Sequence, residues 1–361
     1  MAEKTINRKS PQPMYEQLKN LIKEKIKQGE YLPDQPIPSA LGFCERFDIS
    51  KITVRQALND LAKEGLLYGI TGKGTFVAPA KREKGINLLK VLIPLPFSKK
   101  PGWYLEELME GMRKSAEDNS KGYQLVFDFV GEVSDSDKEP QHPYVKGLIL
   151  LIAWEGEKHL LRYADSKIPA VVVDCFAQGK ICIKVDNIAG GFKATTHLIK
   201  LGHKRISHLR TSNAFDGSER FEGYKKALQE SQLPIEKRLV QESPSGKESA
   251  YSATKKLLQS SPLPTAIFAP GYSMALGAME AIKEKGLKIP DDIAIVGFDD
   301  HQINPAPEPA LTTVKQPISE MGYKAIKMLL DLIEGNLPEE EQKLLEPELI
   351  IRKSCGAYLK K

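Results

Sequence analysis

The chain has 361 residues, more than one ordinary domain holds; 41% of them are hydrophobic and 27% are charged. This composition is typical of a globular protein in water, and no apolar run approaches the roughly 20 residues of a membrane-spanning helix. The net charge is +5, but residues 1–90 hold 16 Lys and Arg against 10 Asp and Glu, whereas the remainder holds 36 against 37. The positive excess in the first quarter favours an anionic partner there, with nucleic acid as the first candidate.

The first nine residues and the four cysteines indicate the cellular compartment in which the protein works. Residues 1–9 are polar and lack the apolar core of a secretory signal, so we expect a cytoplasmic protein with no membrane partner. The four cysteines are scattered without metal-ligand spacing, which is typical of free thiols in a reducing compartment. We also expect no cofactor and no enzymatic activity, because no nucleophile elbow, phosphate-cradling glycine loop or cofactor-lysine motif is present.

Residues 14–64 carry the periodicity of three helices. Ser39 and Ser50 stand at N-cap positions, where their hydroxyls can accept hydrogen bonds from the first free backbone N–H groups. The second and third helices, joined by residues 48–50, form a helix-turn-helix pattern. The predicted helix ranges are 14–28, 39–47 and 51–64.

A hairpin is predicted directly after the third helix. Strands over 66–70 and 75–77 flank the tight turn of residues 71–74, and together they form a wing. The charged residues 78–88 contain proline and glycine and are interpreted as a linker. We therefore expect a winged helix-turn-helix domain over 1–77.

A recognition helix needs an apolar side facing its own domain and a polar side facing the major groove. In the third helix, we expect Ile52, Leu58 and Leu61 to face inward. The polar residues at its start and the glycines of the wing are placed to approach phosphates and base edges. The alternative is an ordinary charged helix followed by an ordinary hairpin. The candidate DNA-binding residues are Ser39, Ser50, Lys51, Thr53, Arg55, Gln56, Thr71, Gly72, Lys73 and Gly74.

From residue 89 onward, strands alternate with helices, which favours an α/β fold with doubly wound parallel sheets. About 270 residues is long for one sheet, so two similar lobes are expected over 89–361. The predicted strands are 90–95, 124–130, 147–153, 170–174, 181–185, 205–210, 265–269 and 293–298. The predicted helices are 104–118, 158–166, 188–201, 219–231, 247–260, 273–286 and 318–334.

A ligand site is expected beyond the carboxyl ends of the strands. Asp174, Asp186, Arg220 and Asp299 fall near such ends, and their charged groups can form paired hydrogen bonds to vicinal hydroxyls. For the aspartates, the alternatives are loop capping or a salt bridge between lobes; for the aromatic residues, the alternative is core packing. The aromatic residues that could cover a sugar ring are Trp103, Tyr104, Trp154, Phe176 and Phe268.

The first domain resembles the GntR-type winged helix over about 65 residues. The motifs that carry the resemblance are Pro38-Ser39, Ile49-Ser50-Lys51, Thr53 to Leu58, Leu61, Glu64 to Leu67 and Gly72 to Val77. The family usually has an acidic residue and then an arginine after the Pro-Ser pair. Ala40 and Leu41 stand there in this chain, so one usual DNA contact of the family is missing.

The second domain resembles the LacI-type effector domain, which is related to periplasmic sugar-binding proteins. The resemblance implies two lobes, three crossovers, an effector in the cleft and a homodimer, with Arg220, Asp299 and Asp186 as the best effector contacts. Joined to a GntR-type reader, it resembles the arabinose-repressor subgroup. The motifs are Gly147 to Leu150, Ile168-Pro169, Asp186-Asn187, Gly190-Gly191, His197 to Ile199, Leu201 to Ile206, Arg220, Gly223-Tyr224, Val296 to Asp300 and Leu311 to Val314.

One departure bears on the effector. Many sugar-responsive members carry Asn-Asp after the strand that ends at Ala269, whereas this chain has Gly271-Tyr272. Tyr272 is therefore a candidate contact. The departure indicates a different hydrogen-bond set or an effector other than a simple hexose or pentose.

These observations together predict a ligand-responsive regulator of transcription. We expect a repressor of a carbohydrate-utilisation operon that binds double-stranded operator DNA as a homodimer and releases it when a sugar-like effector closes the lobes. The alternatives are an activator or a cytoplasmic binding protein for a non-sugar effector, a transport-type solute-binding protein and a sugar-processing enzyme. The DNA-binding pattern of residues 1–77 and the lack of a signal-like start argue against the transport protein, and the lack of catalytic motifs argues against the enzyme.

Overall fold

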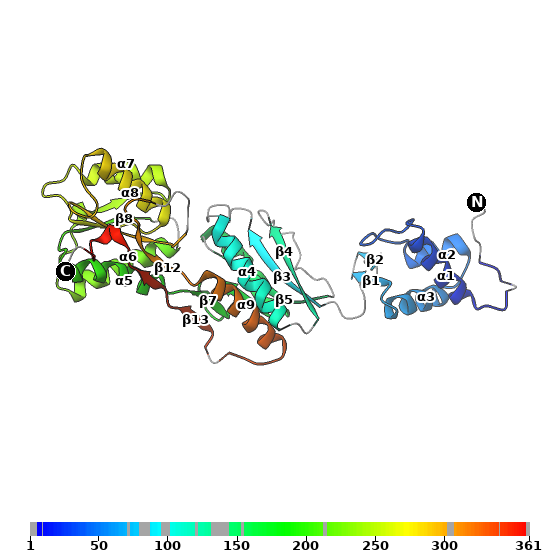
Figure 1. The fold of residues 1–361 in the computed structure, drawn as a ribbon. Helices are drawn as coiled ribbons and strands as arrows, with labels where there is room; N and C mark the ends of the chain where they lie inside the picture. The colour runs from blue at the N-terminus through cyan, green and yellow to red at the C-terminus, as the bar shows by residue number, and fades with distance from the viewer. Residues whose placement is uncertain are drawn as a thin grey trace. The chain divides into compact units, whose positions relative to one another are not determined.

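The computed structural model divides into two compact units, residues 1–86 and 87–361 (Figure 1). Three of the candidate residues, Thr71, Gly72 and Trp154, lie outside the residues that the structure describes. Among the described residues, no helix is both long and apolar enough to cross a membrane. The described ranges are 6–8, 10–70, 73–78, 87–94, 102–119, 122–130, 144–152, 155–211, 215–301, 307–338 and 340–358.

The smaller unit consists of three helices and a hairpin, which confirms the predicted element types. Its elements are α1 (Met14–Lys27), α2 (Ala40–Phe47), α3 (Lys51–Lys63), β1 (Leu67–Ile70) and β2 (Gly74–Val77). β1 and β2 pair in antiparallel register. The core is built from the apolar stripe of each helix and the inward side of the hairpin, with Leu18, Ile22, Phe43, Val54, Ala57, Leu61 and Val77 almost fully buried.

The larger unit contains two six-stranded sheets, as expected for two lobes. The first lobe holds a parallel sheet in the order β13-β7-β6-β5-β3-β4. Helices α4 and α9 pack on one face of this sheet through a shared apolar cluster. The strands are β3 (Asn87–Pro94), β4 (Tyr123–Val130), β5 (Val145–Leu151), β6 (Ala170–Val173), β7 (Cys182–Val185) and β13 (Gln342–Leu345); the helices are α4 (Gly102–Asp118), η2 (Glu155–Asp165) and α9 (Ile318–Ile333).

The second lobe has the strand order β14-β12-β11-β10-β8-β9, with only β14 antiparallel to its neighbour. Helices α5 and α6 cover one face and α7 and α8 the other, so the strands are buried on both sides. The strands are β8 (Ile206–Arg210), β9 (Val240–Glu242), β10 (Ala266–Phe268), β11 (Ala294–Phe298), β12 (Thr312–Lys315) and β14 (Glu348–Ile350). The helices are α5 (Asn187–Lys200), α6 (Phe215–Glu230), α7 (Lys247–Leu257), α8 (Tyr272–Glu284), η3 (Lys237–Leu239) and η4 (Lys353–Cys355).

The two lobes repeat one strand order. Strands β4, β3, β5, β6, β7 and β13 of the first lobe take the places of β9, β8, β10, β11, β12 and β14 of the second. The chain passes between the lobes three times, from β7 to α5, from β12 to α9 and from β13 to β14. The first residues of α4 and α6 are therefore equivalent, as are the residues that follow β6 and β11.

Several elements differ from the predicted ones. Strands β9, β12, β13 and β14 were not predicted, because each has at most four residues and exposed positions interrupt its apolar pattern. The helix expected over 158–166 is a 3₁₀ run, η2. Strand β3 begins at Asn87, three residues before its predicted start, because Asn87 pairs with Tyr123 of β4.

Two glycines allow α5 and α6 to pack at very short range. A Cβ atom added to Gly191 of α5 would lie 2.2 Å from the carbonyl oxygen of Arg220 in α6. A Cβ atom on Gly223 of α6 would lie 2.2 Å from the carbonyl oxygen of Ile188. Any side chain at either position would therefore force the two helices apart, and the place of Arg220 depends on this packing.

We expect Gly191→Ala to destabilise the larger unit by about 1–3 kcal/mol, because the added methyl group overpacks the α5–α6 contact. The measurement is chemical denaturation of the full chain, followed by circular dichroism. Gly102→Ala is the matched control, since a Cβ atom at Gly102 meets no atom within 4 Å. Equal midpoints for Gly191→Ala and the wild type would contradict this account of the packing.

His208 of β8 is fully buried among aromatic rings. Its ring lies 4.9–5.4 Å, centroid to centroid, from the rings of Phe221, Tyr224 and Phe268. Its Nδ1 lies 3.1 Å from the carbonyl oxygen of Phe268, which makes Nδ1 the protonated nitrogen of the neutral ring. Burial lowers the pKa of His208 to about 3.

This shift makes the second lobe sensitive to acid. An unfolded chain binds a proton at His208 below about pH 6.5, whereas the folded chain does not until about pH 3. The free energy of unfolding is therefore not reduced by His208 above about pH 6.5. As the pH falls from 6.5 toward 3, it decreases by at most about 1.4 kcal/mol per pH unit. We expect His208→Phe to flatten the loss of unfolding free energy between pH 6.5 and 4, while His159→Gln, at an exposed site, leaves it unchanged. An unchanged slope in His208→Phe would refute this.

Candidate functional site

The exposed face of α3 is the candidate nucleic-acid interface. Val54, Ala57, Leu58 and Leu61 point into the core. The opposite face presents Lys51, Ile52, Arg55, Gln56 and Asn59 to solvent. Within the described residues, the side chains of Lys51, Arg55 and Gln56 make no hydrogen bond or ion pair. The interface is therefore cationic and amide-bearing, and it keeps its donors available for phosphate oxygens and base edges.

Two serines fix where the helices of this interface begin. Ser39 Oγ accepts a hydrogen bond from the backbone N–H of Gly42, at 3.1 Å. Ser50 Oγ accepts one from the backbone N–H of Thr53, at 3.2 Å, and lies 2.8 Å from Thr53 Oγ1. Asp48, between the helices, has a left-handed backbone with φ 51°, which gives the tight turn. Ser39 thus fixes the start of α2. Ser50, together with Thr53, fixes the start of α3, the helix that carries Lys51 and Arg55.

The expected orientation of Ile52 is wrong. Its side chain is 79% exposed, whereas Leu58 and Leu61 face inward as predicted. The inward stripe of α3 runs through residues 54, 57, 58 and 61, and position 52 lies two residues, or about 200°, from position 54. Ile52 consequently shares the solvent face with Arg55 and Gln56.

Two further positions border the interface. In the wing, Lys73 is exposed, its backbone N–H donates to the carbonyl oxygen of Ile70, and Gly74 has φ 122°. At the start of α2, Leu41 is 61% exposed, at the position where the resembling family usually has an arginine. Gly74 thus has a backbone conformation that favours glycine, and α2 presents an apolar side chain where the family usually has a cation.

The second candidate site is the place where the two lobes meet, here named the lobe junction. The first lobe brings the start of α4 and the ends of β6 and β7 to it, and the second lobe brings the start of α6 and the end of β11. Its polar and aromatic residues are Trp103, Tyr104, Asp174, Phe176, Lys184, Asn187, Asp216, Glu219, Arg220, Asp299 and His301.

Arg220 is the centre of the second-lobe half of the junction. Only 3% of the residue is exposed. Its Nε donates to Asn187 Oδ1 at 2.9 Å and its Nη1 donates to the carbonyl oxygen of Pro270 at 2.6 Å. Carboxylate oxygens of Asp216 and Asp299 lie 3.3 and 4.0 Å from its Nη atoms. A buried guanidinium needs such partners, since an unpaired one would cost several kcal/mol.

The guanidinium also lies over an aromatic ring, which restricts it further. Its central carbon is 3.7 Å from the centroid of the Phe298 ring. The arrangement leaves Asp216 and Asp299 partly exposed, with one side toward Arg220 and the other toward solvent. These two carboxylates, which Arg220 holds in place, can accept hydrogen bonds from the hydroxyl groups of a polyol.

Asp174 and Asp299 occupy equivalent places in the two lobes. Each directly follows the fourth strand of its lobe, β6 or β11, and each has a left-handed backbone, with φ 71° and 73°. Asp299 is held by Gln316, whose Nε2 donates to Asp299 Oδ1 from the crossover that leads into α9. Asp174 lies beside the buried hydroxyl of Tyr104, and burial and this carboxylate raise the pKa of Tyr104 well above its usual range. Aspartate is one of the few non-glycine residues that adopt this backbone conformation readily.

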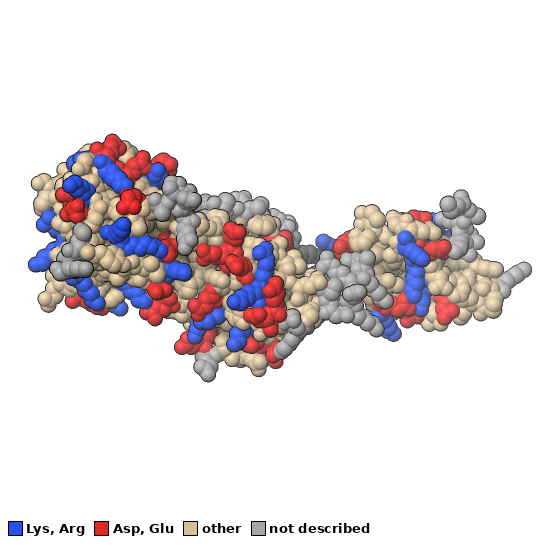
Figure 2. All heavy atoms as spheres, viewed as in Figure 1, with Lys and Arg blue, Asp and Glu red and all other residues tan. Residues whose placement is uncertain are grey.

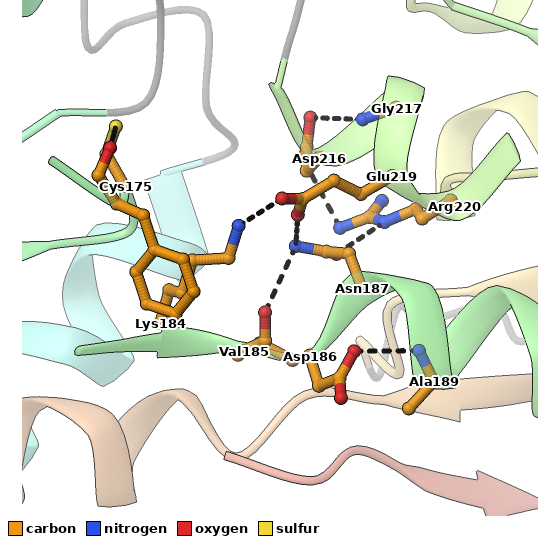
Figure 3. Close-up of polar contacts among 11 residues, drawn as sticks. Cys175, Lys184, Val185, Asp186, Asn187, Ala189, Asp216, Gly217, Glu219 and Arg220 are labelled. Carbon is orange, nitrogen blue, oxygen red and sulfur yellow. Dashed lines mark hydrogen bonds and ion pairs between the residues drawn. The ribbon is translucent and has the colours of Figure 1, made fainter. Parts of the chain in front are cut away.

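An ion pair joins the lobes at the junction. Lys184 Nζ, from β7, donates to Glu219 Oε1 in α6 (Figure 3). Asn187 lies between them and Arg220: its Nδ2 donates to Glu219 Oε2 at 3.4 Å and its Oδ1 accepts from Arg220. The Lys184 side chain is nearly buried, and its ammonium lies 4.8 Å from the ring centroid of Phe176. Phe176 and Lys184 therefore lie side by side on the first-lobe side of the junction.

Aromatic stacking forms a second link between the lobes. The rings of Trp103, in α4, and His301, after β11, are 4.9 Å apart and nearly parallel. Trp103 also packs edge-on against Tyr104, at 6.0 Å. The junction thus has aromatic faces as well as paired charges, a combination suited to a ligand with both apolar and hydroxyl faces.

Three predicted effector residues have other surroundings. Asp186 caps α5, its Oδ1 accepting from the backbone N–H of Ala189 at 2.8 Å, and in Figure 3 it points away from the junction. Phe268 is 0% exposed and packs in the core on His208, which is the role of a packing residue. Tyr272 is almost buried at the start of α8, and burial raises its pKa.

Five junction residues were not among the predicted contacts: Lys184, Asn187, Asp216, Glu219 and His301. The sequence does indicate Lys184, because a lysine inside the apolar stretch 181–185 must find a charged or polar partner when the strand is buried. Asp216 precedes Arg220 by one helical turn, which is the spacing of an i,i+4 pair. Glu219 and His301 became partners only through contacts between the lobes.

The electrostatics of the larger unit are balanced. Basic and acidic side chains alternate over the face drawn in Figure 2. In the lobe junction, Glu219 pairs with Lys184, Asp216 and Asp299 lie beside Arg220, and Asp174 lies beside Tyr104. Among the described residues, no group of three or more His, Cys, Asp or Glu side chains could hold a metal ion. Because carboxylates outnumber cations there, the junction has acceptors to spare, which suits a ligand whose hydroxyl groups donate hydrogen bonds.

Comparisons with known proteins match both units. Residues 14–77 match the bacterial regulatory proteins of the gntR family, and residues 195–355 match the periplasmic binding protein-like domain. The arabinose metabolism transcriptional repressor of Geobacillus stearothermophilus is 31% identical, over 98% of this chain and 99% of that protein.

Solved structures resemble the larger part of the chain. A regulatory protein of the LacI family from Chloroflexus aggregans has a TM-score of 0.65 at 31% identity, covering 74% of this chain and 98% of that one. The lac repressor dimer bound to operator and the anti-inducer ONPF has a TM-score of 0.64 at 26% identity, covering 75% and 94%.

We expect Glu219→Gln to lower the unfolding free energy by about 2 kcal/mol, because it leaves the nearly buried ammonium of Lys184 without a counter-charge. Glu222→Gln, in the same helix, is the matched control, since Glu222 pairs with Lys225 on the surface, where such pairs contribute little. Chemical denaturation measures both. Equal losses in the two variants would mean that the ion pair between the lobes has no special weight.

Proposed function

Because the chain belongs to the family of transcriptional regulators that join a GntR-type DNA-binding domain to a periplasmic-binding-protein-like domain, we propose that it is a repressor released from operator DNA by a small carbohydrate. The observation that carries this proposal is the coexistence of an exposed cationic recognition face on α3 with a lobe junction of paired charges and aromatic rings. The protein is proposed to act in the cytoplasm, without catalysis.

The DNA-binding part rests on α3 and the wing. Lys51, Arg55 and Lys73 provide positive charge for phosphates, and Gln56 can both donate to and accept from a base edge. Ser39 and Ser50 hold the helix starts, where free backbone N–H groups can bind phosphate oxygens. Thr71 and Gly72 of the wing remain proposed contacts from the sequence pattern.

The effector part rests on the lobe junction. Asp299 and Asp216, which Arg220 holds, offer acceptors to vicinal hydroxyls, and Asp174 offers a further acceptor from the first lobe. Trp103 and Phe176 offer faces for the apolar side of a sugar ring. The relative from Geobacillus stearothermophilus, named for arabinose metabolism, supports a carbohydrate.

The proposed mechanism is a shift between two arrangements of the lobes. A ligand that contacts Asp174 in the first lobe and Asp299 in the second stabilises one relative position of the lobes over the other. Asp299 is bonded to Gln316 of the crossover, so a change at the ligand reaches the segment that connects the lobes. The similar lac repressor binds its operator as a dimer. In a homodimer of this chain formed through the larger unit, such a change would alter the spacing of two DNA-binding domains.

A second candidate is an effector that is not a simple pentose or hexose. Gly271-Tyr272 stands where many sugar-responsive members carry a polar pair, and the Tyr272 ring is almost buried in the apolar cluster that includes Met274. A larger or less polar ligand could use this apolar wall.

The test is fluorescence anisotropy of the full chain with labelled duplexes from its own promoter region. A thermal-shift screen of mono- and oligosaccharides, nucleosides and organic acids first finds stabilising ligands. We expect high-affinity binding to one duplex and its release by a carbohydrate. Equal affinity for all duplexes, whatever ligand is present, would overturn the proposal, and release by a non-carbohydrate would favour the second candidate.

We expect Arg55→Ala to weaken operator binding about tenfold or more, because it removes a cation from the centre of the recognition face. The ligand-induced thermal shift should not change, since Arg55 belongs to the other unit. Lys63→Ala removes another exposed cation, from the last turn of the same helix, and serves as control. If both variants bind like the wild type, α3 is not the recognition helix.

A further inference from the structure

The solvent face of α3 contains one apolar residue whose exposure has no structural explanation. Ile52 is 79% exposed, more than any other large apolar side chain described in the smaller unit. A single exposed apolar residue is ordinary on a protein surface and needs no explanation by itself. Its place on the helix is what gives Ile52 a meaning.

Ile52 is the first residue of the exposed stripe that forms the recognition face. Positions 52, 55, 56 and 59 recur at the helical spacing i, i+3, i+4 and i+7, and all four are exposed. The buried stripe of 54, 57, 58 and 61 lies on the opposite side. The side chain of Ile52 therefore points in the same general direction as those of Arg55 and Gln56.

The start of the helix is also where a groove-bound helix reaches bases. Ser50 is the N-cap, so Ile52 is in the first turn of α3, the turn whose residues contact base edges when a recognition helix enters the major groove. Lys51 and Arg55 on either side can neutralise the phosphates that border the groove. Ile52 can neither donate nor accept a hydrogen bond, so the only base feature it can match is apolar.

We infer that Ile52 reads thymine in the operator, by packing its side chain against the C5-methyl group in the major groove. Thymine is the only DNA base that presents a methyl group there, and apolar side chains recognise it by contact. This inference rests on the proposed operator binding and adds to it a residue that determines base specificity. The contact covers apolar surface on both partners, which explains why Ile52 is left exposed in the free protein.

The test replaces thymine by uracil, which removes the methyl group and leaves base pairing unchanged. In vitro selection with the full chain and random duplexes first gives the preferred half-site. Each thymine of one half-site is then replaced in turn, and anisotropy measures the affinity. For the wild type we expect a loss of about fourfold at one position, the value for one buried methyl group.

Variants assign the loss to Ile52. Ile52→Ala should bind the thymine and uracil duplexes equally, whereas Ile52→Val should still distinguish them. Arg55→Ala should bind both more weakly and keep their ratio. Leu32→Ala, which removes an apolar side chain of 47% exposure outside α3, should behave as the wild type.

The outcomes separate this inference from the proposed function. Selection of a half-site without loss at any uracil position, or an undiminished ratio in Ile52→Ala, would overturn the reading of thymine and leave operator binding intact. Selection of no preferred duplex would overturn both.

Discussion

The guanidinium of Arg220 is the interaction on which the effector side of this molecule depends. It is a buried cation that cannot lose its charge, so the fold must supply partners from every side. Asn187, Pro270, Asp216, Asp299 and the ring of Phe298 do so, and they come from the starts of α5 and α6, the loop after β10 and the end of β11. Any ligand that engages Asp216 or Asp299 therefore acts on a cluster that already joins four segments.

The repeated strand order of the lobes explains why the junction has two matching halves. Equivalent positions carry Asp174 and Asp299 in left-handed backbone, while the equivalent helices α4 and α6 bring Tyr104 to one side and Asp216 to the other. Among the described residues, a charge pair and an aromatic stack link the lobes at the junction. Both links are local, so a ligand with greater affinity for one arrangement can shift the balance at modest cost. The close packing at Gly191 and Gly223 holds α5 against α6 within the second lobe meanwhile.

The sequence predicted the architecture better than the site. Helix caps, the helix-turn-helix and the alternation of strands with helices are local patterns, and the structure agrees with them. Short strands such as β13 and β14 were missed because their residues are paired only after distant segments meet. Ile52 was assigned to the core by composition, although its helical phase excludes it. Phe268 and Asp186 fall near strand ends yet serve packing and capping, which only the three-dimensional contacts reveal. Glu219 and His301 required knowledge of how the lobes meet.

The central claim of this account is that one ligand equilibrium in the lobe junction is coupled to DNA binding by the smaller unit. Thermodynamic linkage makes that coupling reciprocal: if the effector lowers the affinity for operator, operator must lower the affinity for effector by the same factor. The direct measurement is calorimetric titration of the full chain with its effector, with and without saturating operator duplex. The account predicts a weaker effector affinity in the presence of operator, by a factor equal to the loss of operator affinity that effector causes. Equal effector affinity in both titrations would contradict it.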